Sequence, residues 1–146
     1  LGELLGPFHR RAGGPPDRPG GWWFAADVLV SFSEGQVRRP DVSGWRRERM
    51  PEMPEDPPIA VRPDWICEIV SPSRPSKDTI SNMRLYHRAG VPHYWIVDPR
   101  DETLTVHRWG PEGFVHLLGA QRGERVRAEP FMEVELSVGA LFGDDD

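Results

Sequence analysis

The segment DWICEIV, residues 64–70, constrains the fold more than any other part of this chain. It is apolar at nearly every position, which is typical of a central strand covered on both faces. Yet Glu68 stands near its centre, and an ionised carboxylate loses several kcal/mol of hydration in such surroundings unless a cation compensates it. We therefore expect a buried strand in which Glu68 faces something other than apolar side chains.

The residues that follow this strand predict a helix and a second strand. Ser76 or Asp78 is suited to cap the helix, apolar side chains recur along it, and Gly90 is suited to end it. The segment VPHYWIVDP, residues 91–99, then has the pattern of a strand. A strand, helix and strand of this length imply a right-handed parallel crossover.

Hairpins are predicted on both sides of this unit. The segments 22–32 and 36–45 form an antiparallel pair around the turn SEG, and 103–109 and 113–118 form another around GPEG. Between the first hairpin and the central strand, 46–60 reads as loop because its prolines cannot donate ladder hydrogen bonds. We therefore predict an α/β fold whose mixed central β-sheet is flanked by helices and extended by a C-terminal β-hairpin.

Composition limits the class of protein. A length of 146 residues predicts a single domain over 1–146, and a net charge of −5 argues against a protein that coats nucleic acid with its whole surface. The one cysteine, Cys67, cannot form an internal disulfide, which fits a cytoplasmic setting. No apolar run approaches the roughly 20 residues of a membrane span. Because the sequence lacks a signal peptide and a first methionine, we expect a soluble protein whose native chain begins earlier.

Basic residues are concentrated in the segment RRPDVSGWRRER, residues 38–49. A dense group of arginines is either a solvated charge cluster or a patch that binds the phosphates of a nucleic acid. The candidate nucleic-acid-binding residues are Arg38, Arg39, Arg46, Arg47 and Arg49.

Two carboxylates fall on neighbouring predicted strands. Asp41 follows Pro40, which favours a break at the sheet edge, and Glu68 lies within the next strand. If these strands pair, the two acids converge, which is tolerable mainly when a divalent cation binds between them. Hard oxygen ligands favour Mg²⁺ or Mn²⁺ over zinc. The alternative is a capped turn aspartate and an exposed strand glutamate with no shared role.

Several segments carry a family resemblance. RPDVSGW, PDWICEIVSPS and YHRAGVPHYWIVDP agree in order and spacing with the Uma-two family of restriction-endonuclease-like proteins in the PD-(D/E)XK nuclease superfamily. The resemblance extends from about residue 22 to the end of the chain. It implies a metal-dependent phosphodiesterase fold in which Asp41 and Glu68 are the metal ligands and catalytic acids.

The resemblance also implies a lysine, which this chain does not have in the usual places. The strand position two residues after Glu68 is Val70, and the helix position between Asp78 and Tyr86 is Asn82. Asparagine can orient water but has no positive charge. Lys77, the one lysine of the chain, is the remaining candidate for a third catalytic residue, or else an ordinary solvated residue at the helix start.

Three functional classes follow. The first is a Mg²⁺- or Mn²⁺-dependent endonuclease acting on nucleic acid, with DNA the expected substrate. The second is a nuclease fold that binds nucleic acid or a protein without cleaving, since Asn82 replaces the helix lysine. The third is a structural homodimer. Because the net charge disfavours tight binding by a monomer, a homodimer that joins two basic clefts is expected for the first two classes as well.

Other conspicuous residues have a structural and a functional interpretation. Trp22 and Trp23 are suited to stack on bases, but aromatic residues at a strand start more often belong to a core or an interface. The five histidines lack the spacing of a helical metal clamp, so we expect no zinc. Cys67 has no activating base near it in sequence, which is typical of a buried structural thiol.

Overall fold

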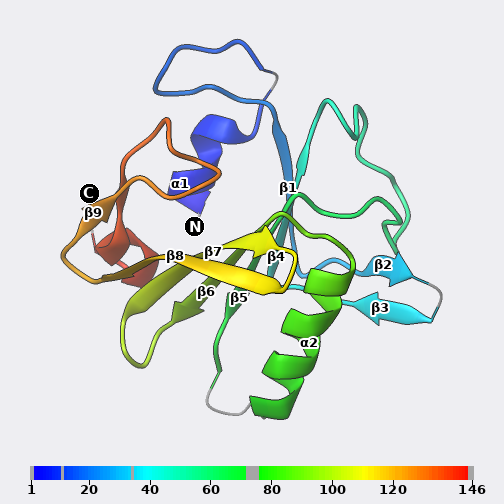
Figure 1. Ribbon diagram of the computed structural model, residues 1–146. Coiled ribbons are helices and arrows are strands. Elements are labelled where there is room, and N and C mark those ends of the chain that lie inside the picture. Colours follow the sequence, from blue (N-terminus) through cyan, green and yellow to red (C-terminus); the bar gives the residue numbers. More distant parts are fainter. Residues whose placement is uncertain (1, 11, 34, 72–75, 145–146) are drawn as a thin grey trace.

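The computed structural model describes residues 2–10, 12–33, 35–71 and 76–144. Its centre is a mixed six-stranded sheet in the order β1-β4-β5-β6-β7-β8 (Figure 1). The strands of this sheet are β1 (Trp22–Ala26), β4 (Val42–Arg46), β5 (Trp65–Ile69), β6 (His93–Asp98), β7 (Thr103–Gly110) and β8 (Gly113–Gln121). Strands β5 and β6 pair in parallel, and the other neighbours pair antiparallel. The predicted mixed sheet and central strand are confirmed.

Helix α2 (Ser76–Arg88) makes the crossover between the two parallel strands. It lies between the main sheet and a small ribbon formed by β2 (Val30–Ser33) and β3 (Gln36–Arg38) (Figure 1). The helix ends at Arg88, and the predicted stop signal Gly90 follows it with a φ of 81°, in the left-handed region that glycine adopts without strain. The crossover therefore brings one face of α2 against the carboxyl end of β5.

The first predicted hairpin is split into two parts, which the sequence pattern did not indicate. Asp27 has a φ of 55°, which ends β1, and its N–H donates to the carbonyl of Asp41 at 3.0 Å. On the returning chain Pro40 has no N–H to continue the ladder from β3 into β4. As a result β1 and β4 stay in the main sheet, whereas β2 and β3 turn away as the ribbon beside α2.

Strand β5 has a different core on each face because its side chains alternate. Trp65 and Cys67 belong to an aromatic core with Trp95 and Phe131. Ile66 points to the opposite face and packs with Tyr86 of α2. Glu68 shares this second face, and so it points toward the helix and away from the aromatic core.

The aromatic core is covered by the two ends of the described chain. It is closed by α1 (Gly2–Leu5), η1 (Gly6–Phe8), β9 (Arg125–Val126), β10 (Leu136–Ser137) and η2 (Val138–Phe142). Trp22 is part of this core, stacked on Phe24 with ring centroids 5.8 Å apart, and the indole N–H of Trp23 donates to the carbonyl of Met50. The structural interpretation of these two tryptophans is confirmed.

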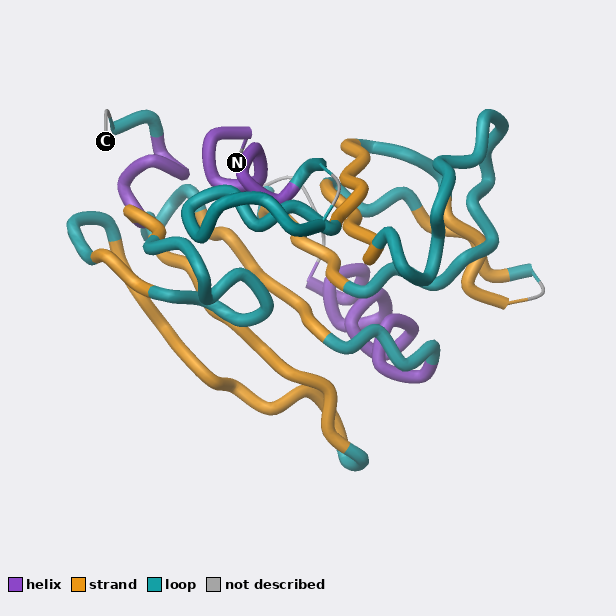
Figure 2. The backbone as a smooth tube through the Cα atoms, turned by 90° about the horizontal axis from the view of Figure 1, so that it is seen from above, coloured by secondary structure: helices purple, strands orange, loops and turns teal. Residues whose placement is uncertain are grey.

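The second predicted hairpin, β7 and β8, is present and forms the far side of the sheet. Seen from above, its two long strands run to a tip that points away from both termini (Figure 2). The pairing is antiparallel, with an irregular register between Val106 and His107. In the described part of the chain, none of the helices has the length and apolar character that a membrane span needs.

Candidate functional site

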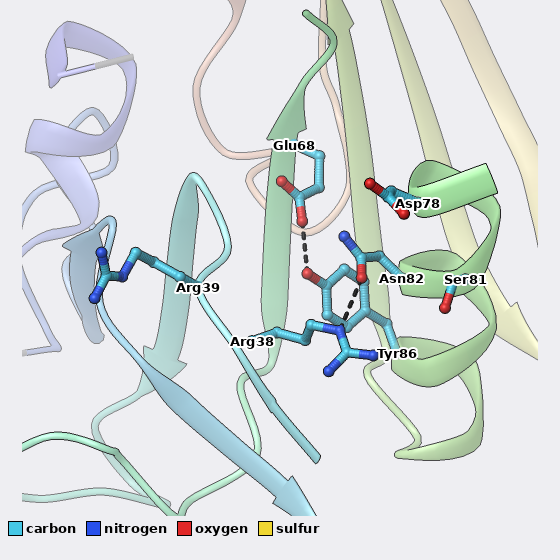
Figure 3. Close-up of a pocket in the computed structure, with 7 residues that line it drawn as sticks. All are labelled: Arg38, Arg39, Glu68, Asp78, Ser81, Asn82 and Tyr86. Atoms are coloured by element: carbon cyan, nitrogen blue, oxygen red, sulfur yellow. Dashed lines mark hydrogen bonds between the residues drawn. The ribbon is translucent and has the colours of Figure 1, made fainter. Parts of the chain in front are cut away.

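A pocket of about 350 Å³ lies where β3, the carboxyl end of β5 and the first turns of α2 meet (Figure 3). Its lining comes from β3 and from the later elements β5 and α2, which follow each other along the chain. The pocket is lined by Arg38, Arg39, Glu68, Asp78, Ser81, Asn82 and Tyr86. Each of these side chains carries a charge, an amide or a hydroxyl group. The pocket is therefore a polar site at the edge of the second core.

Glu68 is the buried acid of this pocket. It is 5% exposed, and its Oε1 accepts a hydrogen bond of 2.6 Å from the Tyr86 hydroxyl. The backbone N–H of Asp41 donates to Oε2 at 3.4 Å. A buried carboxylate needs such donors because it has lost most of its hydration. Glu68 thus faces a hydroxyl, a backbone amide and a polar pocket.

Asp41 lies beside Glu68, directly before β4. Val42 is opposite Cys67 in the antiparallel pair, so the same register brings Asp41 opposite Glu68. The Oδ2 atom of Asp41 accepts a hydrogen bond of 2.6 Å from the N–H of Ile69. The structure therefore brings together the two acids named from the sequence, although Asp41 is held against the backbone of β5 and is not among the residues that line the pocket.

Asp78 is an acid of the pocket that the sequence analysis named as a helix cap and as part of the family's helix spacing, but not as a site residue. Asp78, Asn82 and Tyr86 are spaced four residues apart on α2, so they share one face of the helix. Figure 3 shows this face directed toward Glu68, with Asp78 nearest the start of the helix. The signal was present in the sequence as this spacing, but the direction of the face depends on the crossover.

Burial raises the pKa of the Tyr86 hydroxyl, and the neighbouring Glu68 carboxylate raises this pKa further. The positive charge of Arg38, which lines the same pocket, acts in the opposite direction on this pKa. Tyr86 is therefore a permanent donor to Glu68 at neutral pH.

Burial also raises the pKa of the Cys67 thiol, with Glu68 and Asp41 adding to the effect. A buried thiol held protonated is not a nucleophile.

The five arginines named from the sequence do not gather at one place. Arg38 and Arg39 line the pocket. Arg46 lies at the other end of β4 from Asp41, about 16 Å away at the usual rise per strand residue. The guanidinium of Arg46 lies 4.7 Å from the ring centroid of Trp22, and that of Arg47 lies 3.7 Å from the ring centroid of Trp23.

Arg49 also has a structural environment. Its Nη1 lies 2.8 Å from the carboxylate of Asp64, which is buried, and donates to the carbonyl of Arg62. The sequence could not distinguish these arginines from Arg38 and Arg39, because charge density along the chain does not reveal which side chains pack on tryptophan rings. Lys77 is the second residue of α2, and its side chain lies outside what the structure describes.

The family model Uma2, described as "Putative restriction endonuclease", matches residues 3–140. The chain belongs to the Uma2 family. Among solved structures, its fold is similar to that of "a putative nuclease belonging to DUF820" from Anabaena variabilis, with a TM-score of 0.66 and 22% sequence identity. The match covers 97% of this chain and 73% of that one. No curated protein matches the chain.

The donor atoms at this site of the Uma2 chain fit a hard divalent cation. Asp41 and Glu68 supply carboxylate oxygens at adjoining strand positions, and Asp78 adds an acid to the pocket wall. Mg²⁺ is usually held by one or two carboxylates, with water and substrate phosphate completing its shell. Among the residues the structure describes, no three His, Cys, Asp or Glu side chains form a cluster that could enclose a metal. The site therefore fits an open magnesium or manganese position and not a closed protein cage.

Proposed function

We propose that this member of the Uma2 family is a Mg²⁺- or Mn²⁺-dependent endonuclease that hydrolyses phosphodiester bonds in DNA. The observation that carries the proposal is the pairing of two acids, Asp41 and the buried Glu68, beside a pocket lined by two arginines. Anionic ligands suit the cation, and guanidinium groups suit a phosphate. A site with both kinds of group can bind the metal and the DNA backbone at the same point.

In this proposal the acids of the site and the groups that orient them have separate tasks. Asp41 and Glu68 would hold the cation, which when bound would neutralise and polarise the scissile phosphate. Tyr86 fixes one oxygen of Glu68 through its 2.6 Å hydrogen bond, so the carboxylate keeps its orientation. The peptide N–H of Ile69 fixes one oxygen of Asp41 in the same way. Asp78 lies on the pocket wall, where it can accept a hydrogen bond from the attacking water.

The alternative is a protein that binds DNA or a protein partner at this pocket without cleaving it. Asn82 favours this alternative, because an amide cannot stabilise the charge that develops on the phosphate. A plasmid-nicking assay with Mn²⁺ and with EDTA decides between the two. Metal-dependent nicking by the wild type supports the endonuclease, whereas metal binding without nicking supports the alternative.

The arginines that contact DNA can be identified by salt dependence. Arg38→Ala combined with Arg39→Ala should weaken binding to a duplex of any sequence, because each lost phosphate contact no longer releases a counterion. The slope of log affinity against log salt should fall by about 2 for the two contacts. Fluorescence anisotropy of a labelled duplex in Ca²⁺ measures both quantities without requiring cleavage.

Arg46→Ala combined with Arg47→Ala is the matched control. These side chains lie over Trp22 and Trp23, so their loss should lower stability by about 1–2 kcal/mol and leave the salt slope unchanged. If instead this control variant loses the salt slope and the first variant keeps it, the DNA lies at the other end of β4.

We also propose that a second copy of this chain pairs along β8, the last strand in the sheet order. Edge strands of single proteins are usually protected by lysine, proline or inward charges. Residues 113–121 contain none of these, and Val115 is 50% exposed. Val115→Glu should therefore convert a dimer to a monomer in light scattering, while Glu112→Gln should not. A wild type that is monomeric at all concentrations would contradict this assembly.

A further inference from the structure

We infer that Arg38 is the cationic catalytic residue of this pocket and that Asn82 positions it. The inference rests on the proposed function. Cleavage of a phosphodiester builds negative charge on the phosphate, and a preorganised cation is the strongest means of stabilising that charge. The lining residues from β5 and α2 include two acids, Glu68 and Asp78, and none that the structure describes there is cationic. Arg38 and Arg39, at the end of β3, are the arginines that line the pocket.

The guanidinium of Arg38 is held by neutral acceptors. Its Nε donates to the Oδ1 of Asn82 at 2.9 Å, and its Nη1 donates to the carbonyl of Val37 at 3.0 Å. Within the described part of the chain it forms no ion pair. A neutral amide fixes the orientation of the group without cancelling its charge, which an aspartate in the same place would do. The contact joins β3 to α2 between two residues that line the pocket (Figure 3).

Arg38 also lines the pocket together with the acid that would hold the metal. Glu68 and its hydrogen-bond donor Tyr86 belong to the same lining, and Tyr86 donates to Glu68 at 2.6 Å. In Figure 3 the side chain of Arg38 extends toward Asn82 and Tyr86. A phosphate bound in this pocket beside Glu68 can therefore accept from the three N–H donors of the guanidinium that the bonds to Asn82 and Val37 do not use.

Arg39 lines the same pocket but differs from Arg38 in its ion pairing and in the direction of its guanidinium, which makes it a matched control. Its Nε lies 3.9 Å from the carboxylate of Asp27, so part of its charge is already compensated. Figure 3 shows its guanidinium directed away from Glu68 and Asn82. Arg39 can contact DNA outside the reacting phosphate, where it would affect binding more than catalysis.

The first test is the rate of Mn²⁺-dependent nicking. Arg38→Gln should lower kcat by about a hundredfold to a thousandfold, as the loss of a transition-state donor does, whereas Arg39→Gln should mainly raise KM. Asn82→Asp should also lower kcat, because it keeps the acceptor but neutralises the guanidinium. A merely structural contact would be preserved or strengthened by this change, so the variant separates the two roles.

A rescue variant tests where the charge is needed. Asn82→Lys places a cation on the helix beside the site that Arg38 occupies, and in the Arg38→Gln background it should recover at least tenfold of the lost kcat. Lys77→Ala is the competing case, since Lys77 is the other candidate cation at the start of α2. If Lys77→Ala abolishes nicking and Arg38→Gln does not, the inference is wrong.

A second readout does not depend on cleavage. Removing a cation beside an anionic metal site should tighten metal binding, so calorimetry should give a Mn²⁺ Kd several-fold lower for Arg38→Gln and for Asn82→Asp than for the wild type. Arg39→Gln should change this Kd little. An unchanged Mn²⁺ Kd in Arg38→Gln would overturn the placement of the charge.

The two failures can be told apart. If the wild type binds Mn²⁺ but never nicks DNA, the proposed endonuclease fails, while the order of Mn²⁺ affinities still decides whether the charge of Arg38 acts on the site. If the wild type nicks DNA and Arg38→Gln nicks it equally fast, the endonuclease stands and the inference fails. Absence of Mn²⁺ binding by the wild type refutes both.

Discussion

Glu68→Gln is expected to remove nearly all Mg²⁺ and Mn²⁺ affinity, with a rise in Kd of about a hundredfold or more, and Asp41→Asn should do the same. Each change takes away one of the two carboxylates that adjoin across β4 and β5, and a hard cation has few other anionic ligands here. Because cleavage depends on the bound cation in the proposed function, nicking should be lost with the metal. Titration calorimetry with Mn²⁺ and plasmid nicking measure the two effects.

Both variants should remain folded, which keeps the result interpretable. Glutamine has nearly the shape of glutamate, and its amide oxygen can still accept from the Tyr86 hydroxyl. Removing a buried charge also removes its desolvation cost. Circular dichroism should therefore give a melting temperature equal to or slightly above that of the wild type.

Two further variants complete this experiment. Glu112→Gln, on the turn of the β7–β8 hairpin, changes the net charge equally and should leave the Kd unchanged. Asp78→Asn asks whether the acid of the pocket wall is also a ligand, in which case it should weaken binding about as much as Asp41→Asn. Full Mn²⁺ affinity in both Glu68→Gln and Asp41→Asn would refute the metal site, whatever Asp78→Asn does.

The central unit of the fold could be predicted because its signals are local. A continuous apolar run defines β5, the glycine at position 90 follows the end of α2, and the distance between the two strands requires a crossover. The meeting of Asp41 and Glu68 was expected from the residues only on condition that their strands pair, and the family resemblance assigned both acids to one site. The antiparallel pairing of β4 with β5 brings the two positions opposite each other.

The contact between Arg38 and Asn82 in the pocket could not be predicted in this way. Arg38 lies on the β2–β3 ribbon and Asn82 on α2, 44 positions later in the sequence. No local sequence pattern links the two residues. The ribbon itself depends on the positive φ of Asp27, which turns the chain out of the main sheet. In the sequence, Asn82 is notable because it lacks the positive charge of the family's lysine. In the structure, its side-chain oxygen accepts a hydrogen bond from the positively charged Arg38 of β3.

The aromatic core supports β5 from the side opposite the site. Trp65 and Cys67 point into it, while Ile66 and Glu68 point toward α2. Phe131 is 1% exposed and stands at its centre. The ring centroids of Phe131 lie 4.8–5.7 Å from those of Phe8, Trp22, Phe24, Trp65 and Trp95. One side chain therefore joins the segment after β8 to the start of the chain and to the central strands.

Phe131→Ala is accordingly expected to be the most destabilising single change proposed for this chain. It leaves a cavity among rigid rings that cannot collapse, at a cost of about 3–5 kcal/mol, which is a large part of the usual stability of a domain. The melting temperature should fall by about 10–15 °C in thermal circular dichroism. Met132→Ala, at a neighbouring position that is 53% exposed, should change stability by less than about 0.5 kcal/mol.

The same variant tests whether the site and its support are separable. Since Glu68 and Phe131 lie on opposite faces of β5, the folded fraction of Phe131→Ala at 15 °C should bind Mn²⁺ with the wild-type Kd. A loss of stability with unchanged Kd means that the pairing of β4 with β5 is enough to hold the two acids in place. A fall in stability below about 1 kcal/mol would contradict the packing of Phe131 against the central strands, because so small a cost requires a site that is already loosely filled.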